Sequence, residues 1–331
     1  MKGREIHLTS RPLGWPSEDD FCMAEVVVAD PQAGELLVRN QVMSVDPYMR
    51  GRMNEIPSYV APFDIGRPLE GSAVGTVIES GSALFAPGDV VLHNAGWREY
   101  ATVAEDAATK VDVNLAPPSA YLGVLGMPGL TAYAGILEVA ALCPGEVVFV
   151  SAAAGAVGSA AGQIARLRGA ARVVGSAGSP DKVAYLRGIG FDASFDYHDG
   201  ALRRSLRTAA PDGVDIYFDN VGGRQLEVAI GAMRPHGRVA MCGAISMYNA
   251  DEPPAAPRNL ALAMGKRLTL RGFLAGDFAH LRDQFVAEAA GWLHRGELHY
   301  RETFAEGLPA APSAFLDMMR GRNLGKMLVR L

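Results

Sequence analysis

The hydrophobic positions in the first third of the chain form short runs that glycine, proline and polar residues interrupt. Residues 35–42, 72–78 and 89–92 are apolar runs of strand length, and Pro87-Gly88-Asp89 marks a turn at the start of the third run. Short apolar runs with frequent turn signals are typical of β-strands. The pattern therefore predicts a barrel-like β domain in this part of the chain.

From about Tyr121 onward, strand-like apolar runs alternate with helical stretches. Alternation of this kind indicates β-α-β units, in which parallel strands form a doubly wound α/β sheet. The expected strands cover residues 147–150, 172–175, 214–218, 238–241 and 268–273, and the expected helices cover residues 155–168, 181–188 and 225–233.

The two patterns divide the chain into two domains, which its length of 331 residues also favours. After a helix expected over residues 278–295, strand-like runs follow at 299–304 and 327–331. These strands are too few for a third domain, so we expect them to complete the first one. The prediction is a β-rich domain made of residues 1–122 and 289–331, with an α/β domain of residues 123–288 inserted between these segments.

Composition and charge favour a folded protein without a nucleic-acid or membrane partner. Hydrophobic residues make up 49% of the chain and charged residues 20%, and the net charge is −5. The three cysteines, Cys22, Cys143 and Cys242, are scattered and odd in number, which argues against a disulfide framework and for a reducing compartment. The first residues lack the apolar stretch of a signal peptide. We therefore expect a cytoplasmic protein.

A dinucleotide-binding turn is indicated where the strand at 147–150 leads into an Ala/Gly-rich helix. Gly155 permits close approach of a pyrophosphate, and Gly158 permits close helix–strand packing. The helix N-terminus would offer free N–H groups to the phosphates. Ala153 stands where the usual fingerprint has its first glycine. A tightly packed helix without a ligand is the alternative, and the strand–helix alternation that follows favours the binding site.

The end of the next strand indicates which dinucleotide is bound. NAD sites place an acidic residue there to bind the ribose 2′-hydroxyl. Residues 174–179 contain no carboxylate, and Lys182 follows within one helical turn as a charge partner for a 2′-phosphate. Lys182 could instead be an ordinary exposed helix lysine. The missing acid and the nearby base together favour NADP over NAD.

The sequence lacks the common metal and hydrolase signatures. It has no Cys-x-x-Cys pair, and it reads Leu69-Glu70-Gly71 where a His-Glu pair would follow a strand of the first domain. His294 and His299 have no third ligand nearby, so we expect no metal site. A Gly-x-Ser-x-Gly elbow and a Walker loop are also absent. Without zinc, reduction of an activated alkene is easier to explain than alcohol oxidation, because a hydroxyl donor can stabilise the developing enolate.

An ordered set of motifs resembles one family over nearly the whole chain. The motifs are Arg11–Pro16, Ser44–Met53, Gly126–Tyr133, Ala153–Gly158, Gly178–Lys182, Phe218–Gly223, Cys242–Asn249 and Asn323–Lys326. On these residues the chain resembles the zinc-independent medium-chain dehydrogenase/reductases. Within them it is similar to the branch of prostaglandin reductases, plant double-bond reductases and bacterial curcumin-reductase-like enzymes.

The resemblance implies a GroES-like catalytic domain with an inserted Rossmann domain, and NADPH in the cleft between them. It also implies a homodimer, which would pair through the edge strand near residues 268–273. The implied NADPH-binding residues are Gly155, Ala156, Val157, Gly158, Lys182, Tyr197, Asn220, Cys242, Gly243, Ala244, Ile245, Ser246, Met247, Tyr248, Phe273, Leu274 and Asn323.

Two tyrosines are the candidate catalytic residues. Tyr248 would polarise the substrate carbonyl or hold the nicotinamide ribose, and Tyr48 would face the substrate. Either could instead be a packed aromatic residue whose hydroxyl bonds to other protein groups. Arg52 could serve in an ion pair alone. The α-proton could come from solvent rather than from any of these side chains.

The resemblance implies reduction of the carbon–carbon double bond of α,β-unsaturated ketones and aldehydes. A hydride goes to the β-carbon and a proton then goes to the α-carbon. Two alternatives stay open, an NADPH quinone oxidoreductase and a non-catalytic NADPH-binding sensor. Met247 differs from the polar or smaller residue of several relatives beside the presumed pocket, so substrate preference cannot be transferred from them.

Overall fold

The computed structural model of the protein describes residues 1–331 with the exception of residues 57, 251, 253 and 254. The chain forms two compact units, the first made of Met1–Leu122 and Glu302–Leu331 and the second of Gly123–Arg301. The expected fold class is confirmed, since a β-rich unit contains an inserted α/β unit with a parallel sheet.

The return to the first unit lies later than we predicted. Helix α8 (Arg282–His294) runs without a break across residue 289, where the sequence had placed the boundary. It belongs to the second unit because Phe285 packs against Tyr133 of helix α2 (Met127–Ala134), with 5.4 Å between the ring centroids. Residues 289–301 therefore belong to the α/β unit.

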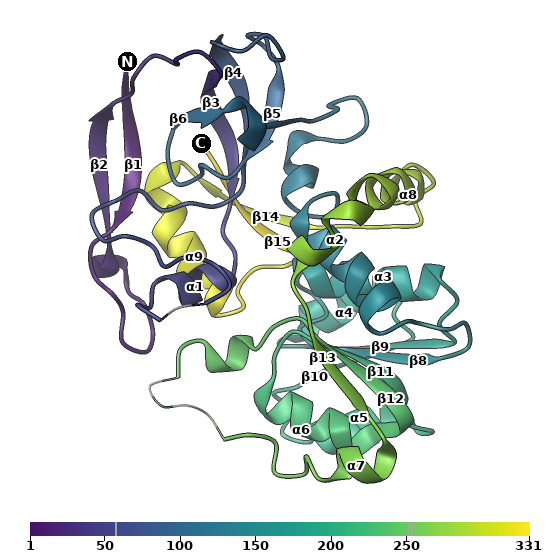
Figure 1. The fold of residues 1–331 in the computed structure, drawn as a ribbon. Coiled ribbons are helices and arrows are strands. Elements are labelled where there is room, and N and C mark those ends of the chain that lie inside the picture. The colour runs from purple at the N-terminus through teal and green to yellow at the C-terminus, as the bar shows by residue number, and fades with distance from the viewer. Residues whose placement is uncertain (57, 251, 253–254) are drawn as a thin grey trace. The chain divides into compact units, whose positions relative to one another are not determined.

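The first unit is built mainly from antiparallel sheet (Figure 1). Its larger sheet has the order β14-β15-β3-β4-β5-β7, with β6 paired to β3, and a smaller sheet pairs β1 with β2. The strands are β1 (Lys2–Leu8), β2 (Phe21–Val27), β3 (Glu35–Ser44), β4 (Ala73–Ser80), β5 (Val90–His93), β6 (Tyr100–Ala104), β7 (Thr109–Lys110), β14 (Glu302–Glu306) and β15 (Lys326–Arg330), and the helices are α1 (Tyr48–Arg52) and α9 (Ala311–Met319). Short 3₁₀ turns cover Glu18–Asp20, Glu105–Ala107, Pro118–Leu122 and Leu308–Ala310.

The strands predicted in this unit are present, shifted by no more than three residues. Strands β3, β4 and β5 correspond to the apolar runs at 35–42, 72–78 and 89–92. Their alternate residues, among them Leu36, Val77 and Val91, form one buried cluster. The sequence did not indicate strands β1 and β2, because their polar residues alternate with few large apolar ones. The two strands pair with each other along all seven residues and not with the main sheet.

The second unit is a doubly wound sheet whose described strands are all parallel. Their order is β10-β9-β8-β11-β12-β13, so the strand order reverses between β8 and β11. The strands are β8 (Val147–Val150), β9 (Arg172–Ala177), β10 (Ala193–Asp196), β11 (Val214–Asp219), β12 (Met233–Met241) and β13 (Thr269–Gly272). The helices besides α2 and α8 are α3 (Ala156–Leu167), α4 (Pro180–Gly188), α5 (Leu202–Ala209), α6 (Gly223–Ala232) and α7 (Leu262–Lys266), with a π-helical turn at Gly135–Val139 and 3₁₀ segments at Ile245–Met247 and Ala275–Leu281.

Helices cover both faces of this parallel sheet. Figure 1 shows α3 and α4 on one face and α5, α6 and α7 on the other. Between the sheet and α5 and α6, Phe149 stacks on Tyr217 at 4.9 Å and belongs to a large buried apolar cluster. This burial on both faces explains why the strands are continuous apolar runs. In the part of the chain that the structure describes, no helix combines the length and apolar character needed to cross a membrane.

Two differences from the sequence prediction have local causes. Strand β10 and helix α5 were missed, because β10 reads Ala-Ser-Phe-Asp and α5 carries several arginines. The helix expected over 278–295 is divided, because Phe278 has non-helical backbone angles (φ −111°, ψ 20°) and α8 begins at Arg282.

Candidate active site

The strand order reverses between β8 and β11, and open α/β sheets bind ligands at the carboxyl ends of strands at such a reversal. Polar groups from both strand ends are joined there. The Tyr217 hydroxyl donates to Asp219 Oδ1 at 2.7 Å and lies 3.0 Å from Ser151 Oγ. The Asn220 side-chain amide donates to the Ser151 carbonyl at 2.8 Å. Asn220, a predicted cofactor residue, is therefore held at the reversal point.

Asp219 is the centre of this network, and the sequence did not single it out. Its side chain is 1% exposed and accepts hydrogen bonds from the Val221 and Gly222 amides at 2.9 and 2.8 Å. Burial raises the pKa of the Asp219 carboxyl, and these hydrogen bonds oppose that rise. The residue organises the loop after β11, which leads to helix α6.

The turn between β8 and α3 is tightly packed and leaves the N-terminus of α3 without a side-chain cap. Ala152 adopts a left-handed conformation (φ 46°), and Gly155 precedes the first residue of α3 with no side chain capping the helix. A Cβ atom on Gly158 would lie 2.5 Å from the Ala152 carbonyl oxygen, so Gly158 lets the helix pack against the turn. A Cβ on Gly155 would have a single neighbouring atom within 4 Å, the same Ala152 oxygen at 3.3 Å. The space beside Gly155 is therefore open. The predicted residues Gly155, Ala156, Val157 and Gly158 thus surround an uncapped helix N-terminus.

Lys182 and Tyr197 both lie near the carboxyl end of β9. The Ser179 hydroxyl accepts a hydrogen bond from the Lys182 amide at 3.3 Å and caps helix α4, so the lysine lies in the first turn. Burial lowers the pKa of the Lys182 ammonium. The Tyr197 hydroxyl would lie 3.0 Å from a Cβ on Gly178, so its ring covers the start of the β9–α4 loop. The structure therefore brings together the two residues predicted for the 2′-phosphate end.

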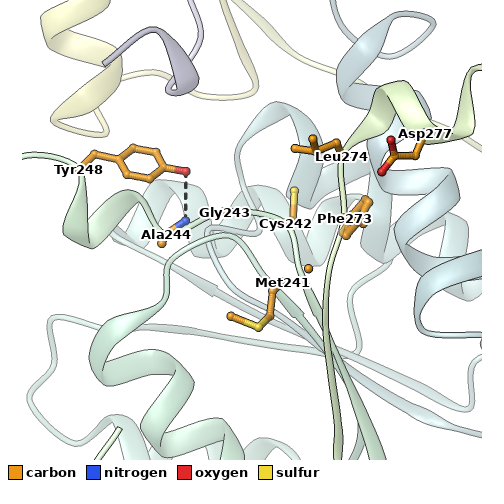
Figure 2. Close-up of a pocket in the computed structure, with 9 residues that line it drawn as sticks. Met241, Cys242, Gly243, Ala244, Tyr248, Phe273, Leu274 and Asp277 are labelled. Carbon is orange, nitrogen blue, oxygen red and sulfur yellow. Dashed lines mark hydrogen bonds between the residues drawn. The ribbon is translucent and has the colours of Figure 1, made fainter. Parts of the chain in front are cut away.

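A pocket of about 460 Å³ lies at the carboxyl ends of β12 and β13 (Figure 2). Six of its lining residues were predicted as cofactor residues, namely Cys242, Gly243, Ala244, Tyr248, Phe273 and Leu274. Met241, Gly272 and Asp277 also line it and were not predicted. Three further predicted residues, Ile245, Ser246 and Met247, are not among the lining residues. Their contacts are with the loop after β11, where Ser246 Oγ donates to the Val221 carbonyl at 2.6 Å.

The Tyr248 hydroxyl is oriented by the backbone of its own loop. It accepts a hydrogen bond from the Ala244 amide at 3.2 Å, as the dashed line in Figure 2 shows. Burial raises the pKa of this hydroxyl above its ordinary value. The hydroxyl therefore keeps its proton at neutral pH, and because it is the acceptor of the Ala244 bond, that proton remains available to another acceptor.

Aromatic packing supports the opposite wall of the pocket. The Phe273 ring makes edge contacts with Phe218 at 6.2 Å and with Phe278 at 6.1 Å. A Cβ on Gly135 would lie 2.4 Å from the Phe218 ring and 2.7 Å from the Phe273 ring, too close for either ring to stay in place. The glycine at the start of the π-helical turn is thus required for this wall, a role that its place in the sequence did not indicate.

The thiol of Cys242 lies in the pocket lining with its reactivity suppressed. Burial and the charge of Asp219 raise the pKa of this thiol to about 12. Because the thiolate is the nucleophilic form, the cysteine behaves as a wall residue at neutral pH.

Two domain families match the sequence. The family described as N-terminal domain of oxidoreductase matches residues 4–111, and the family described as zinc-binding dehydrogenase matches residues 156–292. The NADPH-dependent curcumin reductase of Escherichia coli (strain K12) is 40% identical over 337 residues, which cover 100% of this chain and 97% of that protein. The NADP(+)-dependent 2-alkenal reductase of Nicotiana tabacum is 40% identical over 336 residues, covering 99% and 97%.

The chain belongs to the medium-chain dehydrogenase/reductases. Its place in the branch of curcumin, alkenal and prostaglandin reductases agrees with the resemblance seen in the ordered motifs. Among solved structures, the crystal structure of CurA in complex with NADPH from Vibrio vulnificus matches with a TM-score of 0.94 and 38% identity, covering 99% of this chain and 98% of that one.

This medium-chain dehydrogenase/reductase matches a family that is named for zinc. Among the described residues, no group of three or more histidine, cysteine, aspartate or glutamate side chains is arranged to hold a metal ion. The described part of the chain therefore shows no set of side chains that would serve as ligands for the zinc ion in the family's name.

The remaining predicted residues of this medium-chain dehydrogenase/reductase lie in its first unit. Tyr48 begins helix α1, and burial raises the pKa of its hydroxyl well above the ordinary value. Asn323 precedes β15, and its amide donates to the Gly325 carbonyl at 2.7 Å. Arg52 forms the ion pair foreseen as its alternative role, with Glu70 at 2.8 Å, and its guanidinium lies 4.0 Å from the centre of the Phe63 ring.

Proposed function

We propose that this chain is an NADPH-dependent reductase of the carbon–carbon double bond of α,β-unsaturated ketones and aldehydes. A hydride is added to the β-carbon and a proton to the α-carbon. Relatives at 40% identity over almost the whole chain are named for the reduction of curcumin and of 2-alkenals, both with NADP(H). The observation that carries the proposal is the Tyr248 hydroxyl, a protonated donor in the wall of the pocket.

The residues present fit NADPH. The uncapped N-terminus of α3 and the open space beside Gly155 suit a pyrophosphate, because backbone N–H groups point there and no side chain fills the space. Lys182 and Tyr197 would hold the 2′-phosphate, whose charge would offset the cost of partly burying the lysine. Asn220 and the stretch from Cys242 to Tyr248, together with Phe273, Leu274 and Asn323, would hold the rest. Bound NADPH supplies a hydride.

Tyr248 would stabilise the charge that develops on the substrate during reduction. When the β-carbon of an enone gains a hydride, negative charge accumulates on the carbonyl oxygen as an enolate. The neutral Tyr248 hydroxyl already accepts a hydrogen bond from the Ala244 amide, so it can donate its own proton to another group. A carbonyl oxygen in the pocket is a suitable acceptor. Its raised pKa suits a hydrogen-bond donor rather than a base. Tyr48, whose hydroxyl also stays protonated, would contact the substrate.

The proposal is tested by following NADPH absorbance with purified protein and a panel of enones, enals and quinones. We expect NADPH oxidation with benzalacetone-like enones or alkenals, and much slower oxidation of NADH. Tyr248→Phe should lower kcat by about 10²-fold, the lower range for loss of one donor to a developing oxyanion. Faster turnover of quinones than of any alkene would favour the quinone reductase alternative. Tight NADPH binding with no turnover of any compound would favour the sensor and reject the proposal.

We also propose that two copies pair through β13 as a homodimer in the cytoplasm. Strand β13 is one of the two edge strands of the six-stranded sheet, and Thr269, Arg271 and Gly272 on it are exposed. An edge strand offers unpaired backbone groups to a second copy. The three cysteines are free, as suits a reducing compartment. Light scattering after size-exclusion chromatography should give twice the mass of one chain, and the mass of a single chain would contradict the dimer.

A further inference from the structure

We propose that His198 is a further residue that selects NADP over NAD, because its imidazole donates a hydrogen bond to the 2′-phosphate when it is protonated. This role rests on the proposed placement of the 2′-phosphate beside Lys182 and Tyr197. It adds a residue that lies outside the family's sequence motifs, and it makes the preference between the two cofactors depend on pH.

The His198 ring lies against the loop between β9 and α4. A Cβ on Gly178, the residue directly after β9, would lie 3.2 Å from His198 Cε1 and 3.0 Å from the Tyr197 hydroxyl. The centres of the Tyr197 and His198 rings are 4.1 Å apart, so the two rings cover the start of this loop together. Dinucleotide-binding sheets place the 2′ position of the adenosine ribose at the end of their second strand, which is β9 here. His198 is therefore next to the expected position of the 2′-phosphate.

Asp196, the last residue of β10, orients the imidazole. Its Oδ1 atom accepts a hydrogen bond from the His198 amide at 2.9 Å and lies 3.2 Å from Nδ1 of the His198 ring. An ionised carboxylate only accepts hydrogen bonds, so this contact favours a proton on Nδ1. The other ring nitrogen, Nε2, is bonded to the Cε1 atom that lies beside Gly178. Nε2 is therefore the nitrogen that a ligand at this loop would meet.

The protonation state of the ring decides whether Nε2 attracts a phosphate. With a single proton on Nδ1, Nε2 is an acceptor, and an ionised phosphate oxygen has no hydrogen to donate to it. When the ring gains a second proton, both nitrogens become donors and the ring carries a positive charge that can pair with the phosphate. Histidine is the side chain that ordinarily changes charge between about pH 5 and about pH 8. The contribution of His198 should therefore grow as the pH falls through this range.

The other titratable groups at this loop do not produce the same effect. Burial raises the pKa of the Tyr197 hydroxyl, so Tyr197 stays neutral over the range in which histidine titrates. Burial lowers the pKa of the Lys182 ammonium, but any titration of Lys182 is common to all proteins that keep this lysine. The acidic neighbours are carboxylates, which ordinarily titrate below about pH 5, namely Asp181, Asp196 and Asp199. Replacing His198 alone therefore isolates its part of the pH dependence.

The test measures the affinities of NADP+ and NAD+ by isothermal titration calorimetry at about pH 5.5 and about pH 8, on either side of the ordinary histidine range. NAD+ lacks only the 2′-phosphate, so the ratio of the two affinities reports the contribution of that group. The wild-type protein is compared with His198→Gln, His198→Lys and Lys182→Ala. His294→Gln is the matched control, because His294 is an exposed histidine in the last turn of α8. The phosphate itself gains a proton near about pH 6, and this effect cancels when proteins are compared.

Between the higher and the lower pH, the NADP+ preference of the wild-type protein should rise about two- to fivefold relative to that of His198→Gln. The factor is modest because the His198 side chain is 62% exposed and water screens its charge. His198→Lys is cationic at both pH values, so it should exceed the wild-type preference at the higher pH by a similar factor. His294→Gln should match the wild-type protein at both pH values.

An identical pH dependence in the wild-type protein and His198→Gln, or the same loss in His294→Gln, overturns the role of His198. If Lys182→Ala then still loses the preference for NADP+, the proposed 2′-phosphate site stands without His198. If the wild-type protein binds NAD+ as tightly as NADP+ at both pH values, the proposed placement of the 2′-phosphate fails, and the role of His198 fails with it.

Discussion

A methyl group added at Gly158 should destabilise the α/β unit and weaken NADPH binding. The new Cβ would lie 2.5 Å from the Ala152 carbonyl oxygen, 2.8 Å from the Ala153 Cα and 3.0 Å from the Ala152 carbonyl carbon. All three are backbone atoms that no side-chain rotation can remove, so helix α3 must move away from the turn. Overpacking of this kind costs about 1–3 kcal/mol. Alanine is favoured over glycine inside a helix by about 1 kcal/mol, which offsets part of that cost.

We therefore expect Gly158→Ala to lower the free energy of unfolding by about 2 kcal/mol, since the contacts fall in the severe range. The displaced helix N-terminus should also weaken NADPH binding by about tenfold or more, because its N–H groups would no longer point at the phosphates. Gly188→Ala is the matched control. A Cβ on Gly188, the last residue of α4, meets nothing within 4 Å, so this variant should be neutral or more stable by up to about 1 kcal/mol.

The assay is urea unfolding followed by the fluorescence of Trp292, with Trp15 and Trp97 in the first unit each replaced by phenylalanine in every protein compared. NADPH affinity is measured separately from the fluorescence of the bound nicotinamide. If Gly158→Ala matches Gly188→Ala in both stability and affinity, the turn is not packed as described and the reasoning is refuted.

Two further predictions concern charge. Lys182→Ala should weaken NADPH binding by about 1–3 kcal/mol and NADH binding far less, measured by calorimetry with Lys110→Ala as the control, and equal losses for both cofactors would reject the 2′-phosphate role. Burial lowers the pKa of His93 from 6.5 to about 4, so below pH 6.5 the unfolded chain binds a proton that the folded one does not. Stability should therefore fall by about 2 kcal/mol between pH 6.5 and pH 5. His93→Asn, whose side chain can still accept the Ala95 amide, should remove that part of the pH dependence, and an unchanged slope in urea unfolding would contradict it.

The sequence by itself determined the features that depend on neighbours along the chain. The strand at 147–150 was predicted with its observed bounds, and helix α3 within one residue at each end, because a buried parallel strand is a continuous apolar run and Gly155 marks the turn. The absence of an acid after β9 and the presence of Lys182 likewise required no knowledge of packing. The order of the motifs was enough to indicate the family, and the comparisons confirm it.

Tertiary structure alone decided which distant residues share a surface. Asp277 follows Cys242 by 35 positions yet lines the same pocket, because parallel strands β12 and β13 end at one edge of the sheet. Gly135 is required because Phe218 and Phe273 converge on it from two other strands. Asp219 became notable through its burial and the four hydrogen-bond donors around its side chain, which no spacing in the sequence reveals. Periodicity encodes local backbone conformation, whereas the contacts that shape a pocket and its charge arise when separate elements pack together.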